Sequence, residues 1–448
     1  MRRVRRDFDG QQTGRSAGCI DLETFNDNSR LSPDSQFSPD VAILGAGAAG
    51  LATAILSRRF HPHLSVLLVD SAKRPGAKIL VSGGSRCNVT NAIVSDADFW
   101  GGRRTIVRRV LRGWPVHDTV AFFRDLGVRL HEEADGKLFP DTNRARDVLN
   151  ALLGEADRIG VMLAADRRVV DIAQVERGYR IATTRGDIHA ARVVLAMGGQ
   201  SLPKSGSDGS GFALARQLGH TVVATTPGLV PLVLADEPRG VHRDLQGVAH
   251  AAELTLWLDG KATTRLAGSL LWTHFGISGP VALDMSRHWL RATIEDQSPV
   301  LTLSFCQGQS FEDADSWWMA RAAERPQVSV HQSLAVLVPV SVATALLHRL
   351  AIDDRTTLAH FTRNDRRRLV HALVEWPLAV HGSRGYNYAE VTAGGVSLDE
   401  IDPSTMASRV RQGLFLVGEI LDVDGRIGGF NFQWAWSSAR VCAAALGA

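Results

Sequence analysis

The chain has 448 residues, of which 45% are hydrophobic and 22% are charged, and its formal net charge is +3. This composition is ordinary for a soluble globular protein, and the length suggests two to three domains with a large core. The small net charge gives no reason to expect a nucleic acid or a membrane as a partner.

Targeting and cysteine signals exclude further classes. No apolar run approaches the roughly 18 residues of a membrane span, and no apolar segment follows the basic N-terminal residues as in a secretory signal. The four cysteines, Cys19, Cys87, Cys306 and Cys442, are scattered and form no CxxC pair. We therefore expect neither a disulfide framework nor a zinc site, and a cytoplasmic location.

The first predicted elements form a βαβ unit. Residues 1–38 are rich in Arg, Asp, Ser, Gln and Asn with little apolar periodicity, so we expect a mostly disordered extension there. The apolar run at 40–44 predicts a buried strand, residues 51–59 predict a helix rich in Ala and Leu, and residues 64–69 predict a second strand.

The following segment continues the same α/β domain. Residues 105–130 and 147–159 have apolar residues at helical spacing, and 161–197 reads as short strands with polar turns. Residues 192–199 form a buried strand that ends in a glycine turn. We assign residues 39–226 to the first part of this domain.

The pattern then changes in residues 227–384, which we call the insert. Alternating runs at 253–258 and 300–305 predict antiparallel strands, and residues 340–350 and 365–373 predict helices. The insert is therefore expected to be a β-rich domain that also carries helices.

Residues 385–448 return to α/β character. A strand is predicted at 413–418 and a helix at 431–446. This order predicts a discontinuous domain, whose second part follows the insert.

The strongest motif is Gly45-x-Gly47-x-x-Gly50, which lies between the first strand and the first helix. Gly45 allows a tight turn, Gly47 lets a pyrophosphate approach the backbone, and Gly50 lets the helix pack closely on the strand. Asp70 ends the second strand 20 residues after Gly50, where an acid binds the adenosine ribose and disfavours NADP. The sequence predicts a dinucleotide site.

Two later features favour non-covalent FAD over NAD at this site. A strand ends at Ala196–Gly199, and the C-terminal strand ends in Gly418 followed by Glu419. In two-dinucleotide-fold flavoproteins an acid at that position binds the ribityl chain, and the next helix directs its positive N-terminus at the flavin. Asp422 is an alternative ribityl contact, and both acids could instead cap the following turn.

The segment KILVSGGSRCNVTN at residues 78–91 resembles the signature of the BaiN-type, or aminoacetone-oxidase-like, FAD-binding flavoproteins. Residues 198–207, 273–280, 389–396 and 418–436 resemble the same family, in the same order. The resemblance implies a two-part Rossmann-type FAD domain with a β-barrel-like insert that carries helices. It also implies an oxidoreductase that reduces conjugated enones with reduced nicotinamide or oxidises small amines, and we favour an NAD(P)H-linked reductase.

By this resemblance, the loop at 82–91 packs on FAD, and the backbone of residues 428–431 approaches the isoalloxazine ring. Together with the motifs above, it predicts a cofactor site made of Gly45, Gly47, Ala48, Ala49, Gly50, Asp70, Lys78, Ser82, Gly83, Gly84, Arg86, Cys87, Asn88, Val170, Gly198, Gly418, Glu419, Asp422, Gly428, Gly429, Phe430 and Asn431.

The sequence departs from the family pattern at three places. Ser85 stands where a third glycine is usual, which disfavours a positive φ there. Leu202 stands where an aromatic residue is expected, and the insert is shorter than usual. These departures concern the identity of the substrate more than the binding of FAD.

Single residues allow more than one reading, and no catalytic acid or base can be assigned. Cys87 could be redox-active, but without a CxxC partner a structural role is favoured. His274 could donate a proton or hold backbone, and the second reading is favoured. Arg86 could hold the flavin, an anionic substrate or a surface carboxylate.

Three functions follow from these predictions. The first is an oxidoreductase that transfers a hydride between flavin N5 and a small organic substrate. NAD(P)H would bind only transiently, because Gly206–Gly211 lacks the spacing of a second dinucleotide motif. The second is a flavin-dependent nucleic-acid modifier, which the absence of a clear basic-aromatic stripe makes the weaker alternative. The third is a non-catalytic flavin sensor.

Overall fold

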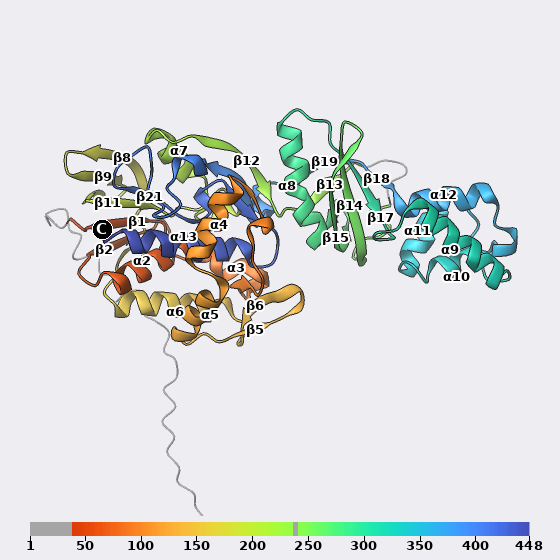
Figure 1. Ribbon diagram of the computed structural model, residues 1–448, viewed down its shortest axis with the longest axis horizontal. Coiled ribbons are helices and arrows are strands. Elements are labelled where there is room, and N and C mark those ends of the chain that lie inside the picture. Colours follow the sequence, from red (N-terminus) through yellow and green to blue (C-terminus); the bar gives the residue numbers. More distant parts are fainter. Residues whose placement is uncertain (1–37, 236–240, 448) are drawn as a thin grey trace, which may run out of the picture.

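The computed structural model describes residues 38–235 and 241–447, so the extension expected at 1–38 lies, apart from Ser38, outside the described residues. Figure 1 shows three parts in a row: an α/β part, a β-rich part with helix α8 (Pro280–Ile294), and a group of helices at the far end. Within the described ranges, no helix combines the length and the apolar character needed to cross a membrane.

The α/β part is built on a five-stranded parallel sheet in the order β21-β11-β1-β2-β7. Its strands are buried apolar runs, as is usual where helices or other layers cover both faces of a parallel sheet. They are β1 (Val41–Leu44), β2 (Val66–Val69), β7 (Met162–Ala164), β11 (Arg192–Leu195) and β21 (Leu414–Leu416). Since β21 follows the insert and pairs with β11, the sheet contains both parts of the predicted discontinuous domain.

Two helices pack together on this sheet, α2 (Ala48–Phe60) and α13 (Phe430–Ala445). A Cβ on Gly50 would lie 1.8 Å from the Gly45 carbonyl oxygen, so only glycine allows α2 this close to the turn. Trp434 and Trp436 are buried, and their indole nitrogens donate to the carbonyls of Gly418 and Val89 at 3.1 and 2.9 Å.

The remaining elements of the first part lie around this core. One expected helix, at residues 105–130, is in fact two helices, because Pro115 ends helical hydrogen bonding between them. The helices and strands are α3 (Ala77–Ser85), β3 (Thr90–Asn91), β4 (Phe99–Gly101), α4 (Arg104–Gly113), α5 (Val116–Asp125), β5 (Leu130–Glu132), β6 (Lys137–Pro140), α6 (Ala145–Arg158), β8 (Val169–Val175), β9 (Gly178–Thr183), β10 (Gly186–Ala190) and α7 (Ser210–Gln217).

The insert is joined to the α/β part by an antiparallel pair, β12 (Val222–Gly228) and β20 (Val391–Val396). Its seven-stranded sheet has the order β18-β17-β14-β15-β16-β13-β19. The edge strands β18 (Trp376–Leu378) and β19 (Val380–Ser383) are separated in sequence only by Ala379. The sheet must therefore curl until its edges meet, which gives the predicted barrel-like shape.

The other strands of this sheet are β13 (Leu232–Leu234), β14 (Ala249–Leu258), β15 (Lys261–Thr273), β16 (Gly276–Ser278) and β17 (Val300–Ser304). Helix α8 (Pro280–Ile294) packs on the sheet and on β12. Four helices lie farthest from the α/β part (Figure 1): α9 (Phe311–Glu324), α10 (Val330–Leu334), α11 (Val340–Arg349) and α12 (Arg363–Val374).

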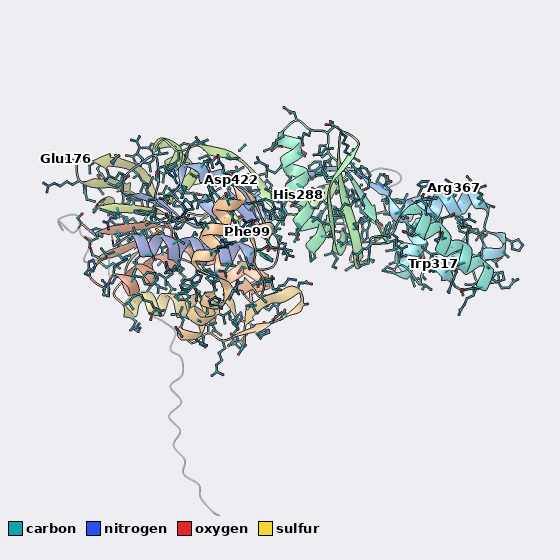
Figure 2. All side chains as sticks on the ribbon, viewed as in Figure 1. Phe99, Glu176, His288, Trp317, Arg367 and Asp422 are labelled. Carbon is teal, nitrogen blue, oxygen red and sulfur yellow. The ribbon has the colours of Figure 1, made fainter. Side chains whose placement is uncertain are left out.

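Helix α8 also forms the junction with the α/β part. Arg287 donates two hydrogen bonds to Asp424 of β22 (Val423–Gly425), at 2.5 and 3.0 Å, and its guanidinium lies over the ring of Trp100. Figure 2 shows Asp422 and His288 on the two sides of this junction. Burial and the neighbouring Arg287 lower the pKa of His288 to about 3, so α8 presents a neutral imidazole to Trp100.

The ionisation of Asp422 at this junction makes the stability of the fold depend on pH. Burial, and then the negative charge of Asp424, raise its pKa from 3.8 to about 6. A carboxyl with a raised pKa in the folded state destabilises the fold as pH rises from about 4 to 6, and the cost is complete above 6. We expect Asp422→Asn to stabilise the protein by about 1–3 kcal/mol at pH 8 and by only about 0.5 kcal/mol at pH 4. Denaturant unfolding of both proteins at the two pH values measures this.

The control for this experiment is Asp354→Asn, since Asp354 is exposed. Its effect should stay within about 0.5 kcal/mol at both pH values. An equal effect of Asp422→Asn at pH 4 and pH 8 would contradict the role of ionisation.

Candidate functional site

A cavity of about 440 Å³ opens at the carboxyl ends of β1, β2 and β11 and at the N-terminal ends of α2 and α13. In open parallel sheets this edge is where ligands bind, because strand ends and helix N-termini converge there. The cavity therefore lies where the sequence predicts a dinucleotide.

The glycine turn forms one end of the cavity. Gly45 has a φ of +104°, and a Cβ there would lie 2.4 Å from the carbonyl oxygen of Ala196. A Cβ on Gly47 would instead meet no atom within 4 Å, because this residue faces the open cavity. The first residues of α2 line this space, and the free N–H groups of a helix N-terminus suit a diphosphate.

Asp70 has a second role besides the predicted contact with ribose. Its carboxylate accepts hydrogen bonds from the backbone N–H groups of Ala46 at 2.6 Å and Ala72 at 2.7 Å. These bonds fix the glycine turn against the end of β2. Burial raises the pKa of Asp70 while both hydrogen bonds lower it. The side chain also lines the cavity and retains lone pairs for a ligand.

Arg167 is a site residue that the sequence reasoning missed. It lines the cavity, it is 5% exposed, and its backbone N–H donates to the Asp70 carbonyl at 2.9 Å. Among the described residues, its buried Nε has no hydrogen-bond partner, and burial lowers the pKa of its guanidinium. A buried cation with a spare donor fits an adenine dinucleotide, but no local motif marks the position.

The loop after α3 forms the middle of the cavity. Ser82, Gly83 and Gly84 line it, and a Cβ on Gly84 would meet no atom within 4 Å. Ser85, which stands where the family usually has a third glycine, adopts a φ of +67°. The serine thus takes the left-handed conformation that a glycine would favour. Asn88 also lines the cavity, and within the described chain its buried Oδ1 has no hydrogen-bond partner.

Arg86 and Cys87 differ in their access to the cavity. Arg86 lines the cavity, pairs with Glu133 at 2.6 Å and lies 4.0 Å over the ring centre of Phe139. Arg86 is thus placed both to contact a ligand in the cavity and to pair with a carboxylate of the protein. Cys87 is fully buried outside the lining, and burial raises the pKa of its thiol to about 12. Cys87 therefore has the surroundings of a structural thiol.

A network of charged and polar groups fixes Glu419. Its carboxylate accepts hydrogen bonds from Lys78 Nζ at 2.5 Å, from Ser201 Oγ at 3.0 Å and from the Thr392 backbone N–H at 2.8 Å. Lys78 and Glu419 line the cavity from opposite parts of the chain, at positions 78 and 419. The network joins the two parts of the discontinuous domain at the wall of the cavity.

The other end of the cavity is the turn before α13. Gly428, Gly429 and Asn431 line it together with Ile427. Asn431 exchanges two hydrogen bonds of 2.8 Å with the backbone of Gly425, which holds the turn at the helix N-terminus. The insert supports the same turn, since Asp284 of α8 accepts a hydrogen bond from the Ile427 N–H at 2.7 Å.

Six of the predicted cofactor residues do not line the cavity. Gly50, Gly418 and Phe430 pack behind it, and Cys87 is buried beside it. Val170 is 56% exposed, because an irregularity in β8 between Val169 and Asp171 turns Val169 to the cavity instead. Asp422 faces Arg287 and Arg291 at the junction. The remaining predicted residues line the cavity: Gly45, Gly47, Ala48, Ala49, Asp70, Lys78, Ser82, Gly83, Gly84, Arg86, Asn88, Gly198, Glu419, Gly428, Gly429 and Asn431.

Three other segments bear on the prediction. The glycine-rich segment at 206–211, which did not qualify as a second dinucleotide motif, contributes Gly206, Ser207 and Ser210 to the same cavity. Leu229, Glu390 and Val391 line it from the segments that enter and leave the insert, a role that their sequence does not signal. His274 lies in a different pocket of the insert, so the geometry does not favour it as a proton donor.

The residues fit FAD. At Gly47 and Gly84 the absence of a Cβ leaves room for a ligand close to the backbone. Arg167 Nε and Asn88 Oδ1, which have no hydrogen-bond partner among the described residues, belong to side chains that line the same cavity. Two further features are expected of a two-dinucleotide-fold flavoprotein. They are the carboxylate of Glu419, which Lys78 holds in place, and the N-terminus of α13. The residues of the cavity therefore fit FAD at the place where the sequence predicts a dinucleotide.

Comparisons with known proteins agree with this assignment. The HI0933-like protein Rossmann domain family matches residues 39–445. The chain is 32% identical to a ribosomal RNA dihydrouridine synthase of Escherichia coli K12, over 90% of this chain and 97% of that protein. It is 30% identical to a 3-dehydro-bile acid delta(4,6)-reductase of Clostridium scindens, over 89% of this chain and 96% of that protein.

Among solved structures, an E. coli quinol fumarate reductase matches at 15% identity with a TM-score of 0.48. The match covers 92% of this chain and 70% of that one. A likeness of this size carries no argument about activity.

Proposed function

The chain belongs to the HI0933-like Rossmann-domain family, and on this premise we propose that it is an FAD-dependent reductase of a carbon–carbon double bond conjugated to a carbonyl group. The relatives named above support this bond type. Dihydrouridine is uridine with a reduced C5–C6 bond, and that bond is conjugated to a carbonyl. The double bonds of a 3-dehydro steroid delta(4,6) system are conjugated to its 3-oxo group. The same bond type is our proposal for this chain.

The observation that carries the proposal is the cavity wall beside the insert. Beyond the turns that cradle the cofactor, the cavity extends to Leu229, Val391 and Glu390. The first two are apolar and the third is a carboxyl. An apolar wall with a single polar group fits a small conjugated substrate.

Bound FAD supplies a hydride equivalent for transfer to carbon. The chain's own residues bind and orient the reactants. Lys78 and Glu419 hold the two halves of the domain together at the cofactor, and the N-terminus of α13 favours negative charge beside it. Asp284 keeps the turn before α13 in place from the insert.

We propose reduced nicotinamide as the electron donor. It would bind transiently, because the glycine-rich segment at 206–211 is already part of the FAD cavity. We also propose a cytoplasmic location. The described cysteines Cys87, Cys306 and Cys442 support it, since they are free buried thiols.

A uridine in RNA is the second candidate substrate for the same reaction. The guanidinium of Arg384 lies 4.5 Å from the ring centre of Phe275 and 3.9 Å from that of Tyr388, and Tyr388 is 53% exposed. Aromatic and arginine side chains stacked in this way form platforms for unpaired bases. Tyr388 of this platform precedes Glu390, which lines the cavity, by two residues in the chain.

One set of anaerobic measurements tests the proposal. NADH or NADPH should bleach the flavin absorbance, and cyclohexenone, a 3-oxo-4-ene steroid or a uridine-containing RNA should restore it with formation of the saturated product. If neither nicotinamide reduces the flavin, the proposed donor is wrong. If dithionite-reduced protein gives its electrons to none of the acceptors, the reductase proposal is wrong. If RNA is the substrate, Tyr388→Ala should slow the reaction with RNA and leave the reactions with cyclohexenone and the steroid unchanged.

A further inference from the structure

Two carboxylates face the cavity in different surroundings. Glu419 is held by Lys78, Ser201 and the backbone of Thr392. Glu390 lines the same cavity, but within the described part of the chain no donor lies at hydrogen-bond distance from its carboxylate. Because their surroundings differ, the two acids are suited to different tasks. Glu419 is suited to a structural role and Glu390 to a chemical one.

The backbone of Glu390 is nevertheless fixed. Its N–H donates to the Leu229 carbonyl at 3.3 Å, and its own carbonyl accepts from Ser201 Oγ at 3.2 Å. Strand β20 begins at the next residue. The carboxyl is therefore presented from a rigid position while its oxygens stay available to a ligand.

The surrounding charges place Glu390 near the turn before α13. Asp284, which accepts the Ile427 N–H, has a pKa raised to about 6, mainly by burial and in part by the charge of Glu390. Arg426 and Lys137 also act on Asp284, and Lys78 acts on Glu390. Glu390 is thus close to the end of the cavity formed by Gly428, Gly429 and Asn431.

The protonation of Glu390 follows from the same surroundings. The side chain of Glu390 is exposed at the cavity. The surrounding protein atoms partly desolvate its carboxyl and so raise its pKa, while the positive charge of Lys78 opposes the shift. A carboxyl with a raised pKa is more often protonated near neutral pH and can then donate its proton. Asp284 is less suited to this role, because it does not line the cavity and already accepts a backbone N–H.

We propose that Glu390 is the catalytic acid that protonates the α-carbon of the conjugated substrate, an inference that rests on the proposed function. As a hydride adds to the β-carbon, the π bond breaks and its electron pair moves toward the α-carbon. That pair forms a C–H bond with the proton of Glu390, whose O–H bond breaks to leave a carboxylate. Water returns the proton, and reduced nicotinamide supplies the two electrons of each turnover.

The test is Glu390→Gln in the FAD-loaded protein. After anaerobic reduction with dithionite, reoxidation by an enone should be slower by about 10²–10⁴-fold than in the wild type. Reoxidation by ferricyanide, which needs no proton at carbon, should be unchanged. The wild-type enone reaction should slow as pH rises through the pKa of Glu390, and the variant should lose this dependence. Glu390→Asp should restore part of the rate and the pH profile.

A readout without turnover separates the acid from a merely structural residue. Infrared difference spectra of the FAD-loaded wild type should show the carbonyl band of a protonated carboxylic acid that disappears as pH rises, and Glu390→Gln should lack it. Glu324→Gln is the matched control, since Glu324 is exposed on α9, in the helices farthest from the cavity. It should match the wild type in every measurement.

The outcomes distinguish the two proposals. If the reduced wild type reacts with no conjugated acceptor, the proposed function is wrong and the role of Glu390 falls with it. If the wild type reacts and Glu390→Gln keeps its rate and pH profile, only the assignment of Glu390 is wrong. Loss of bound FAD from Glu390→Gln would also overturn it, because Glu390 would then hold the cofactor.

Discussion

Replacing Gly47 by valine is expected to give a folded protein without FAD. A Cβ at this position would meet no protein atom within 4 Å, so the added methyl groups project into the space for the cofactor. Gly47 has a φ of −84°, which valine adopts without strain. The variant should therefore keep its fold while the pyrophosphate can no longer reach the backbone of the turn. The ratio of flavin absorbance to protein should fall from near one per chain to near zero.

The control is Gly382→Val in β19, where a Cβ also meets no atom within 4 Å but the residue lies outside the cavity. It should keep its full flavin content. Stability should be compared with wild type from which FAD has been removed, because a bound ligand stabilises the folded state by mass action. Full FAD content in Gly47→Val would contradict the assignment of the site.

The Gly47 turn is the kind of feature that a sequence reveals well. Gly45, Gly47, Gly50 and Asp70 lie within one βαβ unit, so their spacing in sequence fixes their geometry. Asp70 was predicted as a ribose contact, but its hydrogen bond to the Ala46 N–H was not. That bond depends on the exact register of β1 and β2, which spacing alone does not define.

Contacts between distant segments could not be predicted in the same way. Glu390 reaches the cavity because β12 pairs with β20 across the insert. Glu419 and Asp422 were both predicted near the ribityl chain. The short 3₁₀ helix Gly418–Ile420 turns Glu419 toward Lys78, while Asp422 faces the insert. Val170 was displaced by an irregularity in β8, which alternation of residues along a strand does not anticipate.

The junction between the α/β part and the insert has no sequence signature either, yet it accounts for the second large effect. Arg287→Ala is expected to lower the free energy of unfolding by about 3–5 kcal/mol, because it leaves a buried carboxylate without its cation. Asp424 is 1% exposed, and both of its oxygens accept from Arg287. Equilibrium denaturation at neutral pH measures the change.

Arg180→Ala is the matched control for this effect. Arg180 pairs with Asp187 and Asp171 on the partly exposed strands β8 to β10, so its loss should cost at most about 1 kcal/mol. The difference between the two arginines should therefore come from burial rather than from the number of ion pairs.

A double-mutant cycle then separates the ion pair from the packing of Arg287 on Trp100. If the buried charge is the cause, Arg287→Met combined with Asp424→Leu should recover much of the stability that Arg287→Ala loses, because neither charge remains to be solvated. If packing on Trp100 is the cause, the single Arg287→Met variant should already recover it, since methionine keeps an apolar stem of similar length. A loss below about 1 kcal/mol in Arg287→Ala would mean that water reaches Asp424 and that the junction opens in solution.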